Sequence, residues 1–334
     1  MPAPEAAPEV GLGSEPDLVV PPAFAADAGL AIVDRRVAEV GVLLVMVIWS
    51  ANYVVVKAAI GEVSPTGFNF LRLVVGAAAL LAFLRVRGGP MLLARRDMAW
   101  IAVLGAIGFS LYQILWGTAL TTTTAGDSAL IIGASPAIIG LVAAAIGVDR
   151  FTWNKGAGAL VALLGVGLVV TADAGFHADA MGIGDMLTLG AATCWALYVA
   201  LGTPLFSRVR PATSAAWGIV FGAIWMAPFA APDILRDPAV YLAPVPLAAL
   251  LFSGLLAVAL SQVLVMRAVP SLGPIRFANF QFMLPPMAVV LGAIVLGEPI
   301  RPGEIVGGAV IVLGILLSRR EGGLLAALRP RRAS

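Results

Sequence analysis

The chain has 334 residues, of which 60% are hydrophobic and 12% charged, and its formal net charge is +2. Soluble domains average roughly a quarter charged residues, so this composition excludes an ordinary soluble protein, and the small net charge gives no reason to expect a nucleic-acid partner. The single cysteine, Cys194, and the single histidine, His177, exclude an intrachain disulfide and a Cys/His metal or haem cluster. We therefore expect no metal and no cofactor.

The first 37 residues differ from the remainder of the chain. They are rich in Pro and Ala, and all acidic residues up to Asp34 precede the first basic residue, Arg35. A signal peptide would instead begin with a positive region followed by one apolar core. The sequence therefore predicts a disordered N-terminal tail over residues 1–37.

Ten long apolar segments follow this tail. A run of about 18 or more apolar residues can cross the hydrocarbon core of a bilayer, and in lipid such a run satisfies its backbone hydrogen bonds as a helix. The sequence therefore predicts an all-α membrane protein with ten transmembrane helices. The expected helices cover residues 38–60, 68–86, 98–120, 125–148, 152–171, 183–206, 212–231, 244–266, 274–297 and 302–318.

The Lys and Arg residues predict the orientation of these helices, because cytoplasmic connections carry an excess of basic residues. With a cytoplasmic N-terminus, all but four of the 21 basic residues fall on the cytoplasmic side. The four exceptions are Lys57, Arg72, Arg236 and Arg301. We therefore expect a multi-pass protein of a bacterial cytoplasmic membrane with both termini in the cytoplasm, and residues 319–334 as a basic cytoplasmic tail.

The two halves of the chain match when the sequence is shifted by 149 residues, and Trp49 matches Trp195 at a shift of 146. Each repeat holds five helices, at residues 38–172 and 183–318. Because five is odd, the second copy enters the membrane from the opposite side, and inverted repeats of this kind are a transporter architecture. The matching pairs are Gln113 with Gln262, Ala119 with Ala268, Pro136 with Pro285, Asp149 with Glu298, Gly158 with Gly307 and Gly165 with Gly314.

Four short motifs carry a resemblance to a known family. They are Trp49-Ser50-Ala51-Asn52-Tyr53, Pro65…Phe70-Leu71-Arg72, Pro136…Asp149-Arg150-Phe151-Thr152-Trp153 and Pro285…Gly297-Glu298-Pro299. On these motifs, residues 38–320 resemble the EamA-like exporters of the drug/metabolite transporter superfamily. Asp149 departs from the family's usual glutamate. The resemblance implies two five-helix repeats and export of small metabolites.

Aromatic and amide side chains at helical spacing form the candidate substrate site. An amide or an ionisable group inside a membrane helix is costly and usually faces protein or a water-filled cavity. Gln113 and Gln262 would present donors and acceptors from two sides, whereas the alternative for the aromatic face is simple packing. The candidate lining residues are Trp49, Asn52, Tyr53, Lys57, Arg72, Tyr112, Gln113, Trp116, Trp195, Tyr198, Gln262, Asn279 and Gln281.

The two cations of this set allow two interpretations. Lys57 and Arg72 both fall toward the outer ends of their helices. In the first interpretation they reach the outer lipid headgroups or pair with Glu62. In the second they set the electrostatic potential of an outward-opening cavity.

Prolines interrupt the fourth and ninth expected helices. Pro136, Pro285 and Pro286 each remove a backbone hydrogen bond and clash with the preceding turn. They are candidate hinges, with static kinks as the alternative. Paired breaks in corresponding helices of two repeats point to a transport site.

Three acidic residues near helix ends are also candidates. Asp127 is either a proton-coupling carboxylate or part of a solvated helix start. Asp149 and Glu298 are interpreted as structural groups that cap or charge the N-terminus of the following helix.

The sequence therefore predicts an integral-membrane transporter of small amphipathic metabolites that works by alternating access, and the resemblance to the EamA-like family implies export. Aromatic faces bind apolar or cationic groups, and amides suit a substrate that is polar but nearly neutral, so we expect amino acids, related compounds or organic cations. A nucleotide sugar or phosphate ester would need a larger basic cluster. A monomer is compatible with the sequence.

The sequence leaves three other functions to consider. A flippase for a lipid-linked substrate within the same fold is the main alternative. A membrane-embedded enzyme is disfavoured because no nucleophile–base pair can be identified. A channel is disfavoured because neither a selectivity-filter run nor a ring of charge is visible.

Overall fold

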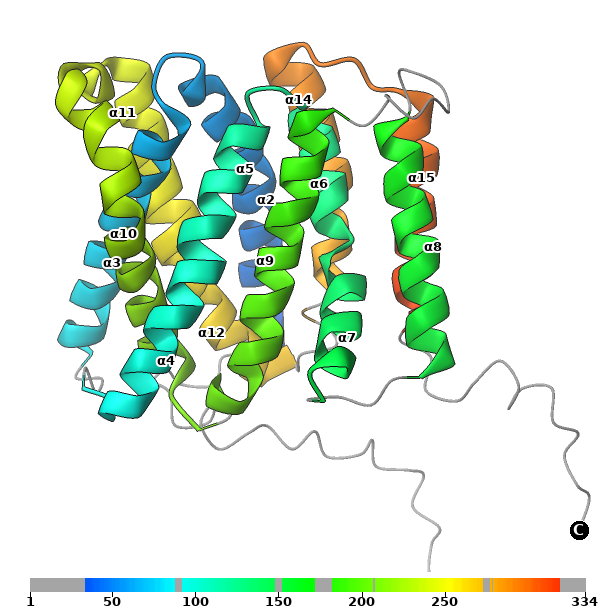
Figure 1. Ribbon diagram of the computed structural model, residues 1–334, viewed down its shortest axis with the longest axis horizontal. Coiled ribbons are helices and arrows are strands. Elements are labelled where there is room, and N and C mark those ends of the chain that lie inside the picture. The colour runs from blue at the N-terminus through cyan, green and yellow to red at the C-terminus, as the bar shows by residue number, and fades with distance from the viewer. Residues whose placement is uncertain are drawn as a thin grey trace, which may run out of the picture.

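The computed structural model describes residues 34–87, 92–147, 152–171, 182–206, 208–272, 277 and 279–318. All regular elements within these ranges are helical (Figure 1). The basic tail at 319–334, nearly all of the predicted N-terminal tail, and the residues Asp149 and His177 lie outside the described residues.

Within the described part of the chain, eight helical spans are long and apolar enough to cross a membrane, and two shorter apolar helices follow them. The eight spans are α2 (Arg35–Ile60), α3 (Pro65–Val86), α4 to α5 (Arg95–Ala119), α6 to α7 (Ala125–Ala145), α8 (Trp153–Val170), α9 (Ile183–Phe206), α10 (Pro211–Arg236) and α11 to α12 (Pro244–Val269). The shorter helices are Gln281–Leu296, which ends in α14 (Leu284–Leu296), and α15 (Pro302–Ser318).

Two of the predicted helices are broken where the prolines predicted a break. α6 (Ala125–Gly133) ends just before α7 (Ser135–Ala145), which has its proline in the first turn. Similarly, the short 3-10 helix η4 (Gln281–Met283) leads into α14, whose first turn holds a proline pair. A proline fits the first turn of a helix because the amide it lacks would be unpaired there, so each helix restarts immediately before its proline.

Two further spans change pitch at a segment that contains no proline. The π-helical segment η1 (Ala106–Leu111) separates α4 (Arg95–Gly105) from α5 (Tyr112–Ala119). The segment η3 (Phe252–Leu260) likewise separates α11 (Pro244–Leu251) from α12 (Ser261–Leu272). Such π segments are frequent at functional sites, and apolar periodicity alone does not predict them.

Several helix ends differ from the predicted ones by a few residues, and two of these differences have a clear local cause. α10 continues to Arg236 although a break was expected after residue 231, because Pro228 and Pro232 are accommodated inside the helix. Prolines are tolerated in membrane helices where neighbouring groups satisfy the freed backbone carbonyls. α2 begins at Arg35 rather than at residue 38, because Asp34 caps it by accepting a hydrogen bond from the amide of Arg36.

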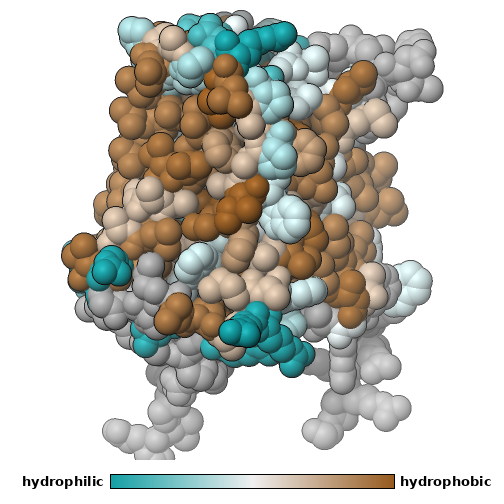
Figure 2. Space-filling view, turned by 60° about the vertical axis from the view of Figure 1, so that its left-hand side comes forward, coloured by the Kyte–Doolittle hydropathy of each residue, from teal (hydrophilic) through white to brown (hydrophobic). Residues whose placement is uncertain are grey.

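The helices pack into one bundle with an apolar surface. α3 packs against α10 and η3, α2 against α12 and α14, and α5 against α9. α8 and α15 pair with one another at one edge of the bundle (Figure 1). Figure 2 shows a broad hydrophobic belt between hydrophilic ends, as expected for a protein surrounded by lipid. Membrane-spanning helices also carry exposed apolar side chains such as Leu160, Ile224 and Phe229.

Polar contacts join the connections at the two ends of the bundle. At one end, Arg208 forms an ion pair of 2.6 Å with Asp97. At the other end, Ser64 donates a hydrogen bond to Asp233, and Thr123 donates one to Asp185 at 2.6 Å. Consecutive spans therefore alternate in direction between these two ends.

Candidate functional site

A cavity of about 780 Å³ lies in the middle of the bundle, which is within the usual range for small-molecule sites. Most of the predicted lining residues surround it, whereas Lys57, Asp127, Tyr198 and Asn279 do not. The predicted residues that line the cavity are Trp49, Asn52, Tyr53, Arg72, Tyr112, Gln113, Trp116, Trp195, Gln262 and Gln281, together with Pro136, Pro285 and Pro286.

One wall of the cavity carries a buried hydrogen-bond network centred on Arg72. Its Nη2 donates to Oε1 of Gln113 at 2.9 Å, and its Nη1 donates to Oγ of Ser253 at 3.0 Å. Ser253 in turn donates to Oδ1 of Asn52 at 2.6 Å. The network joins α2, α3, α5 and η3, so the same contacts that hold the cation also fix the packing of four elements.

This network corrects one interpretation of Arg72. The side chain is 4% exposed and bonds to Gln113 and Ser253, so it neither reaches the surface nor pairs with Glu62. A helix-end position in the sequence suggested headgroup contact, but the acceptors on two neighbouring helices hold the guanidinium inside the bundle. The interpretation that it contributes charge to a cavity remains.

Five predicted aromatic residues form a continuous chain of ring contacts. Tyr53 meets Trp116 edge-on at 5.4 Å, and Trp116 stacks with Tyr112 at 6.4 Å between centroids. Tyr112 contacts Trp195 at 5.9 Å, and Trp195 stacks with Tyr198 at 5.2 Å. Four of these rings line the cavity, whereas Tyr198 is buried behind them.

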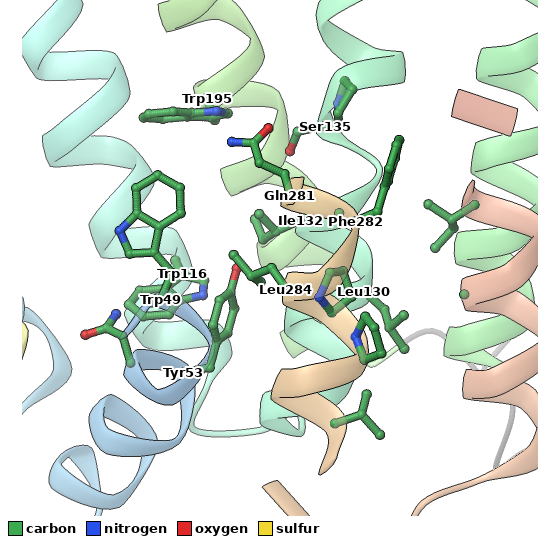
Figure 3. A pocket seen from close by; sticks show the side chains of 18 of the residues that line it. Trp49, Tyr53, Trp116, Leu130, Ile132, Ser135, Trp195, Gln281, Phe282 and Leu284 are labelled. Carbon is green, nitrogen blue, oxygen red and sulfur yellow. The ribbon is translucent and has the colours of Figure 1, made fainter. Parts of the chain in front are cut away.

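The opposite wall is mostly apolar. In Figure 3 the rings of Trp49, Trp116 and Trp195 lie on one side, and Leu130 and Phe282 lie on the other. This second wall comes from α6, η4, α14 and α15, and it gives the cavity two chemically different faces. Its members include Leu130, Ile132, Phe282, Val289, Val290, Ile311 and Val312.

Lys57 belongs to an ion pair next to the cavity rather than to its wall. Its Nζ lies 2.7 Å from Oε1 of Glu298. The carboxylate of Glu298 also accepts from the backbone amide of Ala125 at 3.0 Å. Glu298 thus caps the start of α6, not the helix that follows it in sequence, which corrects the earlier interpretation. The expected pairing of Lys57 with Glu62 is also wrong, because Lys57 pairs with Glu298 instead.

Asp127 lies in an adjacent ion cluster. Its Oδ2 is 3.2 Å from Nη1 of Arg301, and it accepts a hydrogen bond from Thr124 at 2.7 Å. Arg301 is also 3.8 Å from Oε1 of Glu304. Asp127 and Glu304 are 6% and 4% exposed, so a solvated helix start does not describe Asp127.

Two residues at the site, Glu304 and Ser253, were not predicted from the sequence. Glu304 lines the cavity from the first turn of α15. An acidic residue inside an apolar segment was a usable signal for it. Ser253 accepts a hydrogen bond from Arg72, which is 181 positions away in the sequence. A serine in an apolar helix does not by itself indicate such a distant partner.

The sequence model of the EamA-like transporter family matches residues 36–171 and matches again over residues 182–320. The chain belongs to this family. The match covers almost all of the described residues, and the chain is accordingly a multi-pass membrane transporter. The family and the transporter names of its relatives indicate a transporter rather than an enzyme.

Curated EamA-like relatives are similar over most of their length. A "Probable terminal-alkyne amino-acid exporter" of Streptantibioticus cattleyicolor is 29% identical, covering 84% of this chain and 92% of the relative. An "Uncharacterized transporter" of Archaeoglobus fulgidus is 24% identical, covering 82% and 94%. The "Uncharacterized transporter YyaM" of Bacillus subtilis is 25% identical, covering 80% and 88%.

A solved crystal structure shares the fold of this EamA-like chain. The match has a TM-score of 0.60 and 22% sequence identity, and it covers 88% of this chain and 99% of the solved one. At this identity the likeness concerns the arrangement of the helices alone.

Proposed function

We propose that the chain exports small amphipathic metabolites, namely amino acids, related compounds or organic cations, by alternating access. The cavity of about 780 Å³ carries this proposal, because it joins an aromatic and amide wall to a mostly apolar wall. Such a site suits a molecule with one polar end and one apolar end. The name of the Streptantibioticus relative, an amino-acid exporter, supports the same substrate class and direction.

The proposal includes ten membrane-spanning helices arranged as two inverted repeats. Two reciprocal contacts between α8 and α15 support it. A Cβ added at Gly165 would lie 2.7 Å from the carbonyl oxygen of Gly307, and one at Gly314 would lie 2.6 Å from that of Gly158. Gly158 and Gly165 match Gly307 and Gly314 at a shift of 149 residues.

This crossed pattern is what a two-fold axis produces. When two copies meet across such an axis, position i of the first copy contacts position j of the second, and position j contacts position i. The residue numbers also run in opposite directions along the contact, so α8 and α15 are antiparallel. An axis in the membrane plane that relates the fifth and tenth helices accounts for both facts.

A second crossed pair supports the same symmetry. A Cβ at Gly76 of α3 would lie 3.1 Å from the carbonyl oxygen of Gly254 in η3. A Cβ at Gly105 of α4 would lie 3.1 Å from the amide nitrogen of Gly222 in α10. Gly222 follows Gly76 by 146 residues and Gly254 follows Gly105 by 149, so the two contacts are again exchanged between the halves.

We place the moving parts at the two broken helices. The break after Gly133 meets the break before Pro285, since a Cβ at Gly133 would lie 2.9 Å from Cγ of Pro285. Both residues and Pro136 line the cavity. Two helices are thus interrupted where they meet at the site. Each can change its bend at its break without losing regular hydrogen bonds, which suits a hinge.

We assign the ion cluster beside the cavity to gating and to any coupling with protons. Lys57 and Glu298 tie α2 to the connection before α15. Arg301 faces the carboxylates of Asp127 and Glu304, so one cation serves two acids. With Lys57 and Glu298 included, these residues hold two cations and three carboxylates, which leaves room for one bound proton.

A reconstituted transport assay tests the proposal. The full chain in liposomes is expected to catalyse counterflow of radiolabelled amino acids above the rate of protein-free liposomes, and cationic dyes are the second group to test. Movement of fluorescent lipids without movement of either group would identify a flippase instead. Competition by phosphorylated sugars but not by amino acids or organic cations would contradict the proposed substrate class.

A further inference from the structure

Arg72 is buried in the wall of the cavity, and no carboxylate in the described ranges forms an ion pair with it. It is well inside α3, about 10 Å from the start of the helix at a rise of 1.5 Å per residue. Its guanidinium contacts the neutral groups Gln113 and Ser253 and lies 5.0 Å from the ring centroid of Trp116. A cation in a membrane span is expensive, so it marks a functional site by default.

Two buried donors at this wall are unused within the described part of the chain. They are Nε of Arg72 and Nε1 of Trp116. Both residues line the cavity. A buried donor without a partner costs free energy comparable to a lost hydrogen bond, so two of them beside an unneutralised cation favour an anionic acceptor at this wall.

We infer that Arg72 binds the carboxylate of the transported molecule, with the indole N–H of Trp116 as a second donor. This inference rests on the proposed function and narrows it to substrates that carry a carboxylate. Gln113 and Ser253 hold Nη2 and Nη1, which fixes the plane of the guanidinium, whereas Nε has no hydrogen-bond partner in the described part of the chain. A fixed guanidinium recognises a carboxylate well because the two groups match in geometry.

The other features of the cavity favour a single carboxylate over other charged groups. Among the described lining residues, Arg72 and Glu304 are the charged ones. A phosphate ester carries about two negative charges, which Arg72 alone does not neutralise, and Arg72 repels an organic cation that has no acid group.

Matched pairs of compounds test the inference on the unaltered protein. In proteoliposomes, unlabelled phenylalanine, leucine and methionine are each compared with their amides as competitors of labelled amino-acid counterflow. The free acid of each pair is expected to compete at least about tenfold better, as loss of a charge-assisted hydrogen bond predicts. Equal competition by acid and amide would overturn the inference while leaving the proposed function intact. Absence of any counterflow would instead remove the proposed function, and the inference with it.

Two variants and a control add an independent readout. Arg72→Gln is expected to abolish the preference for the acid over the amide, and Arg72→Lys to restore part of it. Arg96→Gln makes the same chemical change at an exposed arginine of α4 and is expected to keep the full preference. An Arg72→Gln protein that still transports and still prefers the acid by about tenfold would overturn the inference. If Arg72→Gln does not fold, the comparison of acids with amides on the wild type decides alone.

Discussion

Nη2 of Arg72 donates a hydrogen bond to Oε1 of Gln113 at 2.9 Å, between two side chains that are 4% and 5% exposed. The contact links α3 to α5 on the wall of the cavity and thus ties bundle stability to the site. A buried guanidinium that loses an acceptor bears the cost of an unpaired donor, about 1–3 kcal/mol. Changes at this contact should therefore affect both the stability of the bundle and transport.

Gln113→Leu is expected to lower both stability and transport. The substitution removes the acceptor for Arg72, so we expect a loss of about 1–3 kcal/mol, measured as a lower melting temperature in detergent. Gln262→Leu is the matched control, because Gln262 lines the same cavity but is only partly buried. It should impair transport with little change in melting temperature. Unchanged transport in both variants would remove the amides from the site.

The contact between α8 and α15 predicts a selective glycine effect. Gly165→Ala adds a Cβ that would lie 2.7 Å from the carbonyl oxygen of Gly307. We expect it to destabilise the protein by about 1–3 kcal/mol through overpacking. Gly167→Ala is the control, because a Cβ there meets nothing within 4 Å. It should be neutral or stabilising, since alanine favours helices over glycine. Equal melting temperatures for both variants would refute this packing.

Lys57 and Glu298 should be energetically coupled. Their ion pair of 2.7 Å is partly buried, with side chains 25% and 13% exposed. A double-mutant cycle with Lys57→Met and Glu298→Gln should therefore give an interaction energy of about 0.5–3 kcal/mol in thermal unfolding. Additive effects of the two changes would mean that the pair does not hold this end of the bundle together.

The coupling proposal predicts which acids control pH dependence. Asp127 and Glu304 share Arg301, and Lys57 and Glu298 lie beside them, so a proton bound by this cluster changes its net charge during transport. If transport depends on pH, Asp127→Asn or Glu304→Gln should flatten the profile measured between pH 5.5 and 8.5. Both variants keeping the full wild-type profile would exclude the cluster as the coupling site.

The orientation is testable by cysteine labelling. In a Cys194→Ser background, Leu92→Cys and Glu62→Cys provide exposed positions in connections at opposite ends of the bundle. With both termini cytoplasmic, an impermeant maleimide should label Glu62→Cys in intact cells and Leu92→Cys only in inverted vesicles. The reverse pattern would contradict the proposed orientation.

Much of the architecture follows from the sequence, because lipid forces long apolar runs into helices. The helix breaks at Pro136 and at Pro285 were predictable, since proline has a fixed backbone geometry. The π segments η1 and η3 were not, because their residues are as apolar as those of an ordinary helix. The glycines that match at a shift of 149 residues were visible in the sequence, but the contacts between them in α8 and α15 depend on tertiary packing.

The site was predictable as a set of residue types but not as a network. Aromatic and amide residues at helical spacing indicated most of the lining. The sequence did not reveal that Arg72 turns inward, because its acceptors Gln113 and Ser253 come from distant segments. Likewise, Lys57 finds Glu298 rather than the nearby Glu62, since tertiary packing decides which opposite charge comes within reach.

The most direct test of the central claim is substrate protection inside the cavity. Ser135 is buried and lines the cavity, so Ser135→Cys in the Cys194→Ser background places a thiol at the site. The rate at which a methanethiosulfonate reagent blocks counterflow is measured with and without the best-transported amino acid, and the labelling rate of Leu92→Cys serves as the control. If the cavity is the transport site, the amino acid should slow modification of Ser135→Cys several-fold and leave Leu92→Cys unaffected. An unchanged rate at Ser135→Cys, in a protein that still transports, would contradict it.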